Sequence, residues 1–243
     1  MSRMEPTLDR RLLREEVVVV LMLSVLASAV YAIIDLLSAP ISGVYVAAGN
    51  QSSEFAKQLT GFVFGLGPVY LVVHLVRRSR EGLLGIGLDG DRPVEDLLRG
   101  CALFAVVGVA GIGVYLAAVA LGVNRFVVPV PPLGHWWTVP ALVLNSLQAA
   151  LKEEVIVVAY LVTRLGQLGW SDRRSIGASA LLRGSYHLYQ GLGGFAGNLA
   201  MGLLFAWLFT KTRRAWPFVV AHFLLDVAAG VGFLLFRERL PGF

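Results

Sequence analysis

Long apolar runs alternate along the chain with short polar and basic stretches. Seven runs are apolar enough to form helices in a bilayer, where a spanning helix needs roughly 20 residues. They are residues 17–37, 59–76, 101–123, 141–162, 176–189, 195–209 and 216–236. The pattern predicts an all-α fold, a polytopic membrane helix bundle of about seven transmembrane helices. The fifth and sixth runs are shorter than a full span, so we expect short helices that tilt little or line a cavity.

Composition excludes an ordinary soluble domain. Hydrophobic residues make up 56% of the 243 residues and charged residues only 15%, whereas roughly a quarter is charged in soluble domains. The single cysteine, Cys101, lies in an apolar run, which excludes both a disulfide framework and a cysteine-ligated metal site. The net charge of +5 is what basic cytoplasmic loops require, so we expect the lipid bilayer as a partner and no nucleic acid.

Lysine and arginine are divided unevenly between alternate loops. Fifteen of the 21 fall on one side of the predicted membrane, in residues 1–16, 77–99, 163–175 and 210–215, and only four fall on the other side. Because cytoplasmic loops carry the excess of basic residues, the N-terminus is predicted to be cytoplasmic and the C-terminus outside. We expect an integral, multi-pass protein of the plasma (inner) membrane.

Ionisable side chains inside the apolar runs are the candidates for chemistry. An ionised group at the bilayer centre costs about 2.5 to 3.5 kcal/mol, so such groups need partners or water. Contacts between membrane helices normally use Ser, Thr, Asn or Gln instead, and three helices that each bring such groups indicate a polar site in the bundle core. The groups are Lys152, Glu153, Glu154, Arg183, His187, His222 and Asp226.

Helical spacing predicts which of these groups lie on the same face of a helix. In the fifth and seventh runs the two ionisable residues are four apart, so each pair shares one face of its helix. Glu153 and Glu154 are adjacent and diverge by about 100° around the helix axis. We therefore expect only one of the two glutamates to point squarely into a shared site.

Carboxylates and imidazoles in an apolar cavity suit hydrolysis by an activated water. A buried carboxylate can act as general base, and a cationic or N–H group can stabilise the developing oxyanion. Two histidines and a carboxylate are also ligands that Zn²⁺ prefers, and bound Zn²⁺ would activate the water instead. The sequence does not separate these two mechanisms. It contains no His-Glu-x-x-His motif, which excludes the zincin arrangement.

The order of these groups resembles the CPBP intramembrane proteases, which include the CAAX prenyl endopeptidases and the bacterial Abi proteins. The family pattern is Glu-Glu-x-x-x-Arg, then Phe-x-x-x-His, then His-x-x-x-Asn/Asp, on successive membrane helices. Here Glu153-Glu154, His187, and His222 with Asp226 stand at the corresponding places, within residues 141–230. The resemblance implies an intramembrane endopeptidase whose substrate is a membrane-associated peptide or protein.

The resemblance also implies a role for each site residue. Glu153 would activate the water and Glu154 would orient it or support the site. His187 and His222 would bind a metal or stabilise the oxyanion, with Asp226 beside His222. If a metal such as Zn²⁺ is present, its expected ligands are Glu153, His187, His222 and Asp226.

Two positions depart from the family pattern. Val158 stands where the first motif has Arg, and Arg183 stands where the second has Phe. We predict that Arg183 pairs with Glu154 from the neighbouring helix and replaces the missing arginine. The departures keep open a non-catalytic membrane partner protein on the same scaffold, and buried Glu, His and Asp groups keep open a small proton-coupled transporter.

The chain divides into four parts on this interpretation. Residues 1–16 form a cytoplasmic amphipathic segment, with a short surface helix from Leu8 to Glu16 in which Leu13 faces the acyl chains. Residues 17–137 form the N-terminal transmembrane helices and loops, and the first run is a retained anchor with no small-residue cleavage site after it. Residues 138–236 form the CPBP-like catalytic helices, and residues 237–243 a C-terminal tail.

Overall fold

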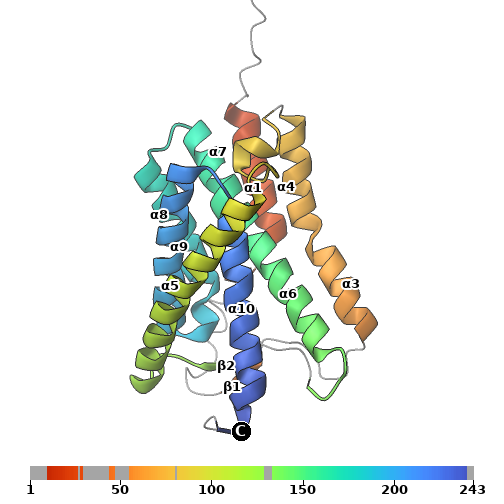
Figure 1. The fold of residues 1–243 in the computed structure, drawn as a ribbon. Coiled ribbons are helices and arrows are strands. Elements are labelled where there is room, and N and C mark those ends of the chain that lie inside the picture. Colours follow the sequence, from red (N-terminus) through yellow and green to blue (C-terminus); the bar gives the residue numbers. More distant parts are fainter. Residues whose placement is uncertain are drawn as a thin grey trace, which may run out of the picture.

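The helices lie side by side in a bundle, and their axes run roughly between its two ends (Figure 1). The computed structural model describes residues 10–26, 28–29, 44–46, 55–79, 81–128 and 133–239. Its α-helices are α1 (Arg10–Ser24), α3 (Phe55–Gly65), α4 (Gly67–Arg78), α5 (Pro93–Ala120), α6 (Thr138–Lys152), α7 (Leu161–Gln167), α8 (Asp172–Tyr186), α9 (Leu192–Thr212) and α10 (Trp216–Phe236). The predicted helical membrane bundle is confirmed.

Shorter elements connect or interrupt these helices. A π-helix, η2 (Glu153–Tyr160), joins α6 to α7 without a break, and three 3₁₀ turns are η1 (Leu83–Ile86), η3 (Leu188–Gln190) and η4 (Arg237–Arg239). Two three-residue strands, β1 (Val44–Val46) and β2 (Phe126–Val128), pair in parallel, with Tyr45 opposite Val127. These strands are the part of the described chain that the all-α prediction did not include.

Four helical stretches of the described residues are long and apolar enough to cross a membrane: Gly61–Arg78, α5, α9 and α10. Helix α10 has the predicted bounds. Helix α9 is 21 residues long, so the expectation that the sixth run is too short is wrong: the helix also includes the flanking Leu192 and Thr212. Helix α8, with 15 residues, is short as expected. The number of spans stays a prediction.

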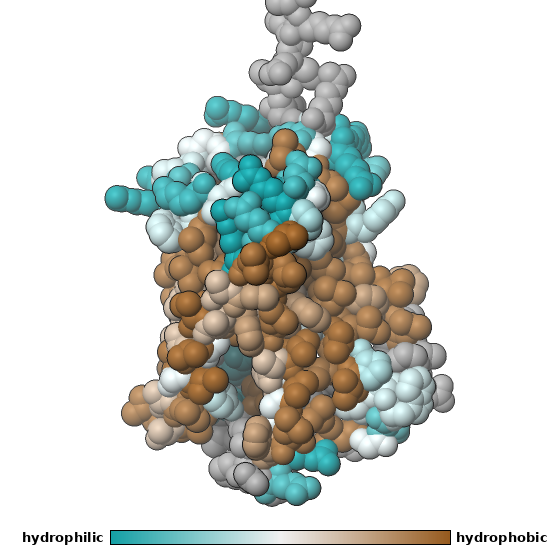
Figure 2. Space-filling model, in the orientation of Figure 1, coloured by the Kyte–Doolittle hydropathy of each residue, from teal (hydrophilic) through white to brown (hydrophobic). Residues whose placement is uncertain are grey.

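Charged residues collect at one end of the bundle. Figure 2 shows a hydrophilic cap there and a broad hydrophobic band below it. In the same orientation, Figure 1 places the beginnings of α1, α5 and α8 and the ends of α4 and α9 at this end. Arg77 and Arg78 lie in the last turn of α4 and Lys211 in the last turn of α9. This grouping supports the predicted cytoplasmic side, while the orientation itself stays a prediction.

Helix α1 does not begin with a separate surface segment. It runs without a break from Arg10 to Ser24, so residues 10–16 and the start of the first apolar run are one helix. Leu13 is 1% exposed and packs inside the protein, so the expectation that it faces the acyl chains is wrong. Residues 1–9 and 30–37, which belong to the first two predicted regions, lie outside the described residues.

The π-helix η2 is the innermost element of the described structure. Its residues Val155 to Tyr160 are all fully buried. All of them except Val157 belong to the main hydrophobic cluster, which also contains Val72 and Val76 of α4, Phe205 and Phe209 of α9, and Phe218 of α10. Val157 packs with Tyr186 of α8 in a smaller cluster. Glu153 and Glu154 therefore enter the bundle on an element that is held by packing on several sides.

Candidate active site

Glu153 and Glu154 both contact the guanidinium of Arg183. Arg183 of α8 lies 2.6 Å from Glu154, measured from Nη1 to Oε1, and 3.3 Å from Glu153, measured from Nη2 to Oε2. The expectation that only one glutamate points into the site is wrong. The glutamates open a π-helix, whose wider i→i+5 turns change their angular relation, and π-helical turns are frequent at functional sites.

The predicted pairing of Arg183 with Glu154 is confirmed. Both side chains are fully buried, and the pair links η2 to α8. Arg183 therefore contacts Glu154, the glutamate with which the arginine of the first family motif would pair. Lys152, which precedes the two glutamates, forms no ion pair with either of them in the described structure.

His222 of α10 lies against the same pair. Its Nδ1 is 2.7 Å from Glu154 Oε1, and since an ionised carboxylate only accepts hydrogen bonds, Nδ1 carries the proton and donates it. The 3.2 Å approach of Arg183 Nη2 to that nitrogen is then a packing contact between two donors. On the other side of the ring, Nε2 lies 3.5 Å from Asp226 Oδ2. His222 is held between two carboxylates.

His187 follows the last residue of α8 and is partly exposed. Its Nδ1 lies 3.0 Å from the Arg183 carbonyl oxygen, to which it can only donate. This hydrogen bond orients the ring and leaves Nε2 free to face a ligand. The His187 ring centroid lies 4.8 Å from that of Tyr186, whose hydroxyl donates to Glu153, so His187 lies next to the residues that contact the glutamates.

The turn after His187 is held by the segment that precedes β2. Arg125 N donates to Gln190 O at 2.8 Å, and Asn124 Oδ1 accepts from Gly194 N at 2.8 Å. Gly191 has φ +99°, and a Cβ there would lie 2.6 Å from the Val123 carbonyl oxygen. Only glycine fits this close approach without strain. The turn that follows His187 thus depends on residues 123–125, which lie outside η2, α8 and α10.

Tyr186 is a site residue that the sequence analysis did not single out. Its hydroxyl donates to Glu153 Oε2 at 2.8 Å. A tyrosine inside an apolar run has no distinctive spacing, and its role became visible only with the fold. Its position three residues after Arg183, on the same face of α8, was the one available signal.

Exposure divides the site into a closed and an open part. The side chains of Arg183 and Glu154 are fully buried and that of His222 is 6% exposed, whereas the Glu153 side chain is 15% exposed and that of Asp226 is 40% exposed. Solvent therefore reaches Glu153, His187 and Asp226 first. The Arg183–Glu154 pair lies deeper in the protein and contacts no solvent.

Glu153, Glu154 and His222 each offer one ligand atom, and these atoms lie within 4.8 Å of one another. By atom type and spacing this cluster could hold a metal ion, although it does not include His187 or Asp226 from the predicted ligand set. The charges around it do not fit a divalent cation, because the Arg183 guanidinium already contacts both carboxylates. A second fixed cation at that distance would be repelled.

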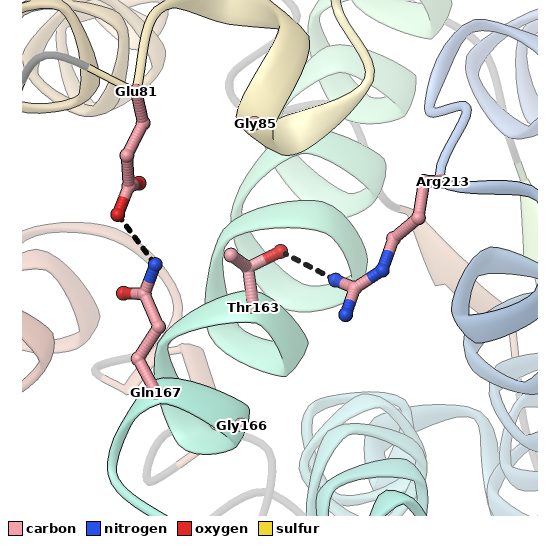
Figure 3. Close-up of a pocket in the computed structure, with 6 residues that line it drawn as sticks. All are labelled: Glu81, Gly85, Thr163, Gly166, Gln167 and Arg213. Carbon is pink, nitrogen blue, oxygen red and sulfur yellow. Dashed lines mark hydrogen bonds between the residues drawn. The ribbon is translucent and has the colours of Figure 1, made fainter.

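A separate polar cluster lies at the charged end of the bundle. The buried Arg164 of α7 binds Glu81 at 2.7 Å and Glu16 at 3.4 Å. Beside it is a pocket of about 370 Å³, in which Glu81 and Gln167 face Thr163 and Arg213 across the opening (Figure 3). The pocket is lined by none of the predicted site residues, so the structure separates it from the glutamate site.

Residues 135–228 match the family model of the Rce1-like proteins, described as type II CAAX prenyl endopeptidase Rce1-like. This stretch is similar to that family. It contains η2, α8 and the part of α10 that carries His222 and Asp226, so Glu153, Glu154, Arg183, Tyr186, His187, His222 and Asp226 all lie inside the matched range. The match covers less than half of the chain, and α1 to α5 lie outside it. At family level the match indicates a CAAX-type intramembrane endopeptidase.

Neither the curated proteins nor the solved structures contain a match to the chain.

Proposed function

We propose that the protein is an intramembrane endopeptidase that hydrolyses a membrane-associated peptide or protein with a water activated by Glu153. The observation that carries this proposal is the partly exposed Glu153 carboxylate in front of a fully buried Arg183–Glu154 pair. A base needs access to water, and its supporting groups need to be fixed. The site has both properties.

The reaction follows from these positions. Glu153 takes a proton from a water molecule, and the hydroxide attacks the carbonyl carbon of the scissile peptide bond. The Nδ1–H of both histidines already donates to a protein oxygen, so the negative charge on the carbonyl oxygen is stabilised by the Nε2–H of a doubly protonated His187 or His222. When the C–N bond breaks, the proton held by Glu153 passes to the leaving amine and the carboxylate is restored.

Arg183 takes the place of a metal in this scheme. Its single positive charge is shared by the two glutamates and fixes their orientation, so the water is activated by a carboxylate base and not by a bound ion. Zn²⁺ chemistry would instead require the cation to share the carboxylates with the guanidinium. A chelator distinguishes these two mechanisms.

The non-catalytic partner protein was favoured by the departures at positions 158 and 183. The Arg183–Glu154 contact weakens that alternative, because it supplies from α8 the charge that Val158 cannot supply.

The experiment is a cleavage assay with the purified full chain in detergent or nanodiscs, using a library of membrane peptides and mass spectrometry of the products. We expect cleavage by the protein and none by Glu153→Gln. If no peptide is cut and a membrane protein co-purifies in stoichiometric amount, the partner-protein alternative is correct.

A further inference from the structure

The two oxygens of the Glu153 carboxylate have different surroundings. Oε2 accepts a hydrogen bond from the Tyr186 hydroxyl at 2.8 Å and lies 3.3 Å from Arg183 Nη2. Oε1 accepts no hydrogen bond from any described residue. Oε1 is not one of the fully buried atoms without a hydrogen-bond partner, so part of its surface is accessible to solvent. The site therefore has one occupied and one free oxygen.

The Tyr186 ring is fixed before any substrate arrives. It is 6% exposed and packs against Val157 of η2 together with Val25 and Ala29. Its ring centroid lies 4.8 Å from that of His187. A phenol held in this way keeps its hydroxyl aimed at one oxygen of Glu153.

We propose that Tyr186 is a positioning residue that holds Oε2 of Glu153 and leaves Oε1 as the atom that takes the proton from water. This inference rests on the proposed function and adds to it the reactive atom and the side chain that selects it. Without the phenol, Oε2 keeps only its 3.3 Å contact with Arg183 Nη2, so the carboxylate is less restrained from rotating about its last bond and offering either oxygen to the water. It also loses a donor that stabilises its ionised form.

The chain contains a matched control. Tyr160 is also buried, and its hydroxyl donates to a carboxylate, Glu16 Oε1, at the same distance of 2.8 Å. That hydrogen bond belongs to the separate polar cluster at the charged end. Tyr160→Phe and Tyr186→Phe thus delete the same atom and the same kind of hydrogen bond, once outside the active site and once within it.

The experiment measures kcat, KM and the pH dependence of kcat for the wild-type protein, Tyr186→Phe, Tyr160→Phe and Glu153→Gln. For Tyr186→Phe we expect kcat to fall roughly 10-fold to 100-fold with KM unchanged, as for loss of a hydrogen bond to a charged group. The acidic limb of its kcat profile moves to higher pH, since fewer donors stabilise the ionised base. Tyr160→Phe keeps the wild-type kcat and profile.

Other results distinguish the role of Tyr186 from the proposed endopeptidase function. If the wild-type protein cleaves, Glu153→Gln does not, and Tyr186→Phe retains the wild-type kcat and profile or loses activity equally with Tyr160→Phe, the role of Tyr186 is wrong and the proposed function stands. If Glu153→Gln cleaves like the wild-type protein, both inferences are wrong.

A second substitution covers the case in which Tyr186→Phe does not fold. Fluorotyrosine at position 186 keeps the shape of the ring and makes the hydroxyl a stronger donor. We expect the acidic limb of the profile to move to lower pH. An unchanged profile would contradict the role of Tyr186.

Discussion

Arg183 of α8 and Glu154 of η2 form an ion pair in which both side chains are fully buried, with 2.6 Å between Nη1 and Oε1. In the family pattern the arginine is on the same helix as the glutamates, whereas here it comes from the next helix along the chain. The contact joins η2 to α8, so it supports both the fold and the candidate site.

Arg183→Leu should destabilise the protein strongly, because it leaves Glu154 buried without its counter-charge. Breaking one partner of a buried pair costs about 3 to 5 kcal/mol. The double variant Arg183→Leu with Glu154→Leu should regain part of that stability, since the fully buried charge of Glu154 is gone and only the partly exposed Glu153 has lost its cation, but it should remain inactive. Thermal unfolding in detergent and the cleavage assay measure the two effects. Equal midpoints for Arg183→Leu and the wild-type protein would show that the pair contributes nothing.

The arginine that pairs with Glu154 should be movable from position 183 to position 158. Arg183→Phe alone should abolish cleavage, and Arg183→Phe combined with Val158→Arg should recover part of it. Position 158 is four residues after Glu154, so an arginine there can reach the same carboxylate along one helix. The control is Val158→Arg alone, which adds a second buried cation and should lose stability. Failure of the double variant to exceed Arg183→Phe in activity would contradict the exchange.

Acid stability should depend on Asp89 at the charged end. A hydrogen bond from Arg214 holds the pKa of the Asp89 carboxyl below its ordinary value of 3.8. A group with a lowered pKa in the folded state stabilises the fold above its ordinary pKa, and this contribution is lost as the pH falls through the lowered value.

Asp89→Asn should therefore destabilise the protein at neutral pH and reduce the loss of stability below about pH 4. The measurement is the unfolding midpoint as a function of pH. The control is Asp91→Asn, at an exposed neighbour, which should leave the curve close to that of the wild-type protein. Parallel curves for Asp89→Asn and the wild-type protein would contradict the role of the Arg214 contact.

The helices could be predicted from hydrophobic pattern because long apolar runs in a bilayer have few other folds open to them. The bounds of α10 and the Arg183–Glu154 contact were both predicted correctly, the second from the absence of an arginine at position 158. The contact of both glutamates with Arg183 was not predicted, because only one of them was expected to point into the site. The two glutamates open the π-helix η2, and no residue in Glu153–Tyr160 marks a change from i→i+4 to i→i+5 hydrogen bonds.

Two further differences have physical causes. Leu13 was expected at the acyl chains because the leucine and arginine spacing near the N-terminus is amphipathic, but the same spacing also suits a helix that packs inside a bundle. Tyr186 was missed because its part in the site comes from a contact between η2 and α8. Such a contact across 33 residues leaves no periodic signal in the sequence.

Removal of metal ions should leave cleavage intact. Because Arg183 already contacts both glutamates, a chelator should change turnover by less than about twofold, and the purified protein should contain substoichiometric zinc. Turnover before and after chelation, with metal content by mass spectrometry, measures this. Loss of cleavage that added Zn²⁺ restores would show that Glu153, Glu154 and His222 hold a catalytic ion after all.

The most direct measurement compares turnover of a cleaved membrane peptide by the wild-type protein and by Glu153→Gln, with both proteins shown to have the same unfolding midpoint. Glu153 is partly exposed, and its nearest cation keeps Glu154 as a partner, so the substitution should leave the fold intact. We expect turnover to fall by roughly 100-fold or more, as for loss of a general base. Turnover within a few-fold of the wild-type value in a folded Glu153→Gln protein would contradict the assignment of Glu153 as the group that activates water.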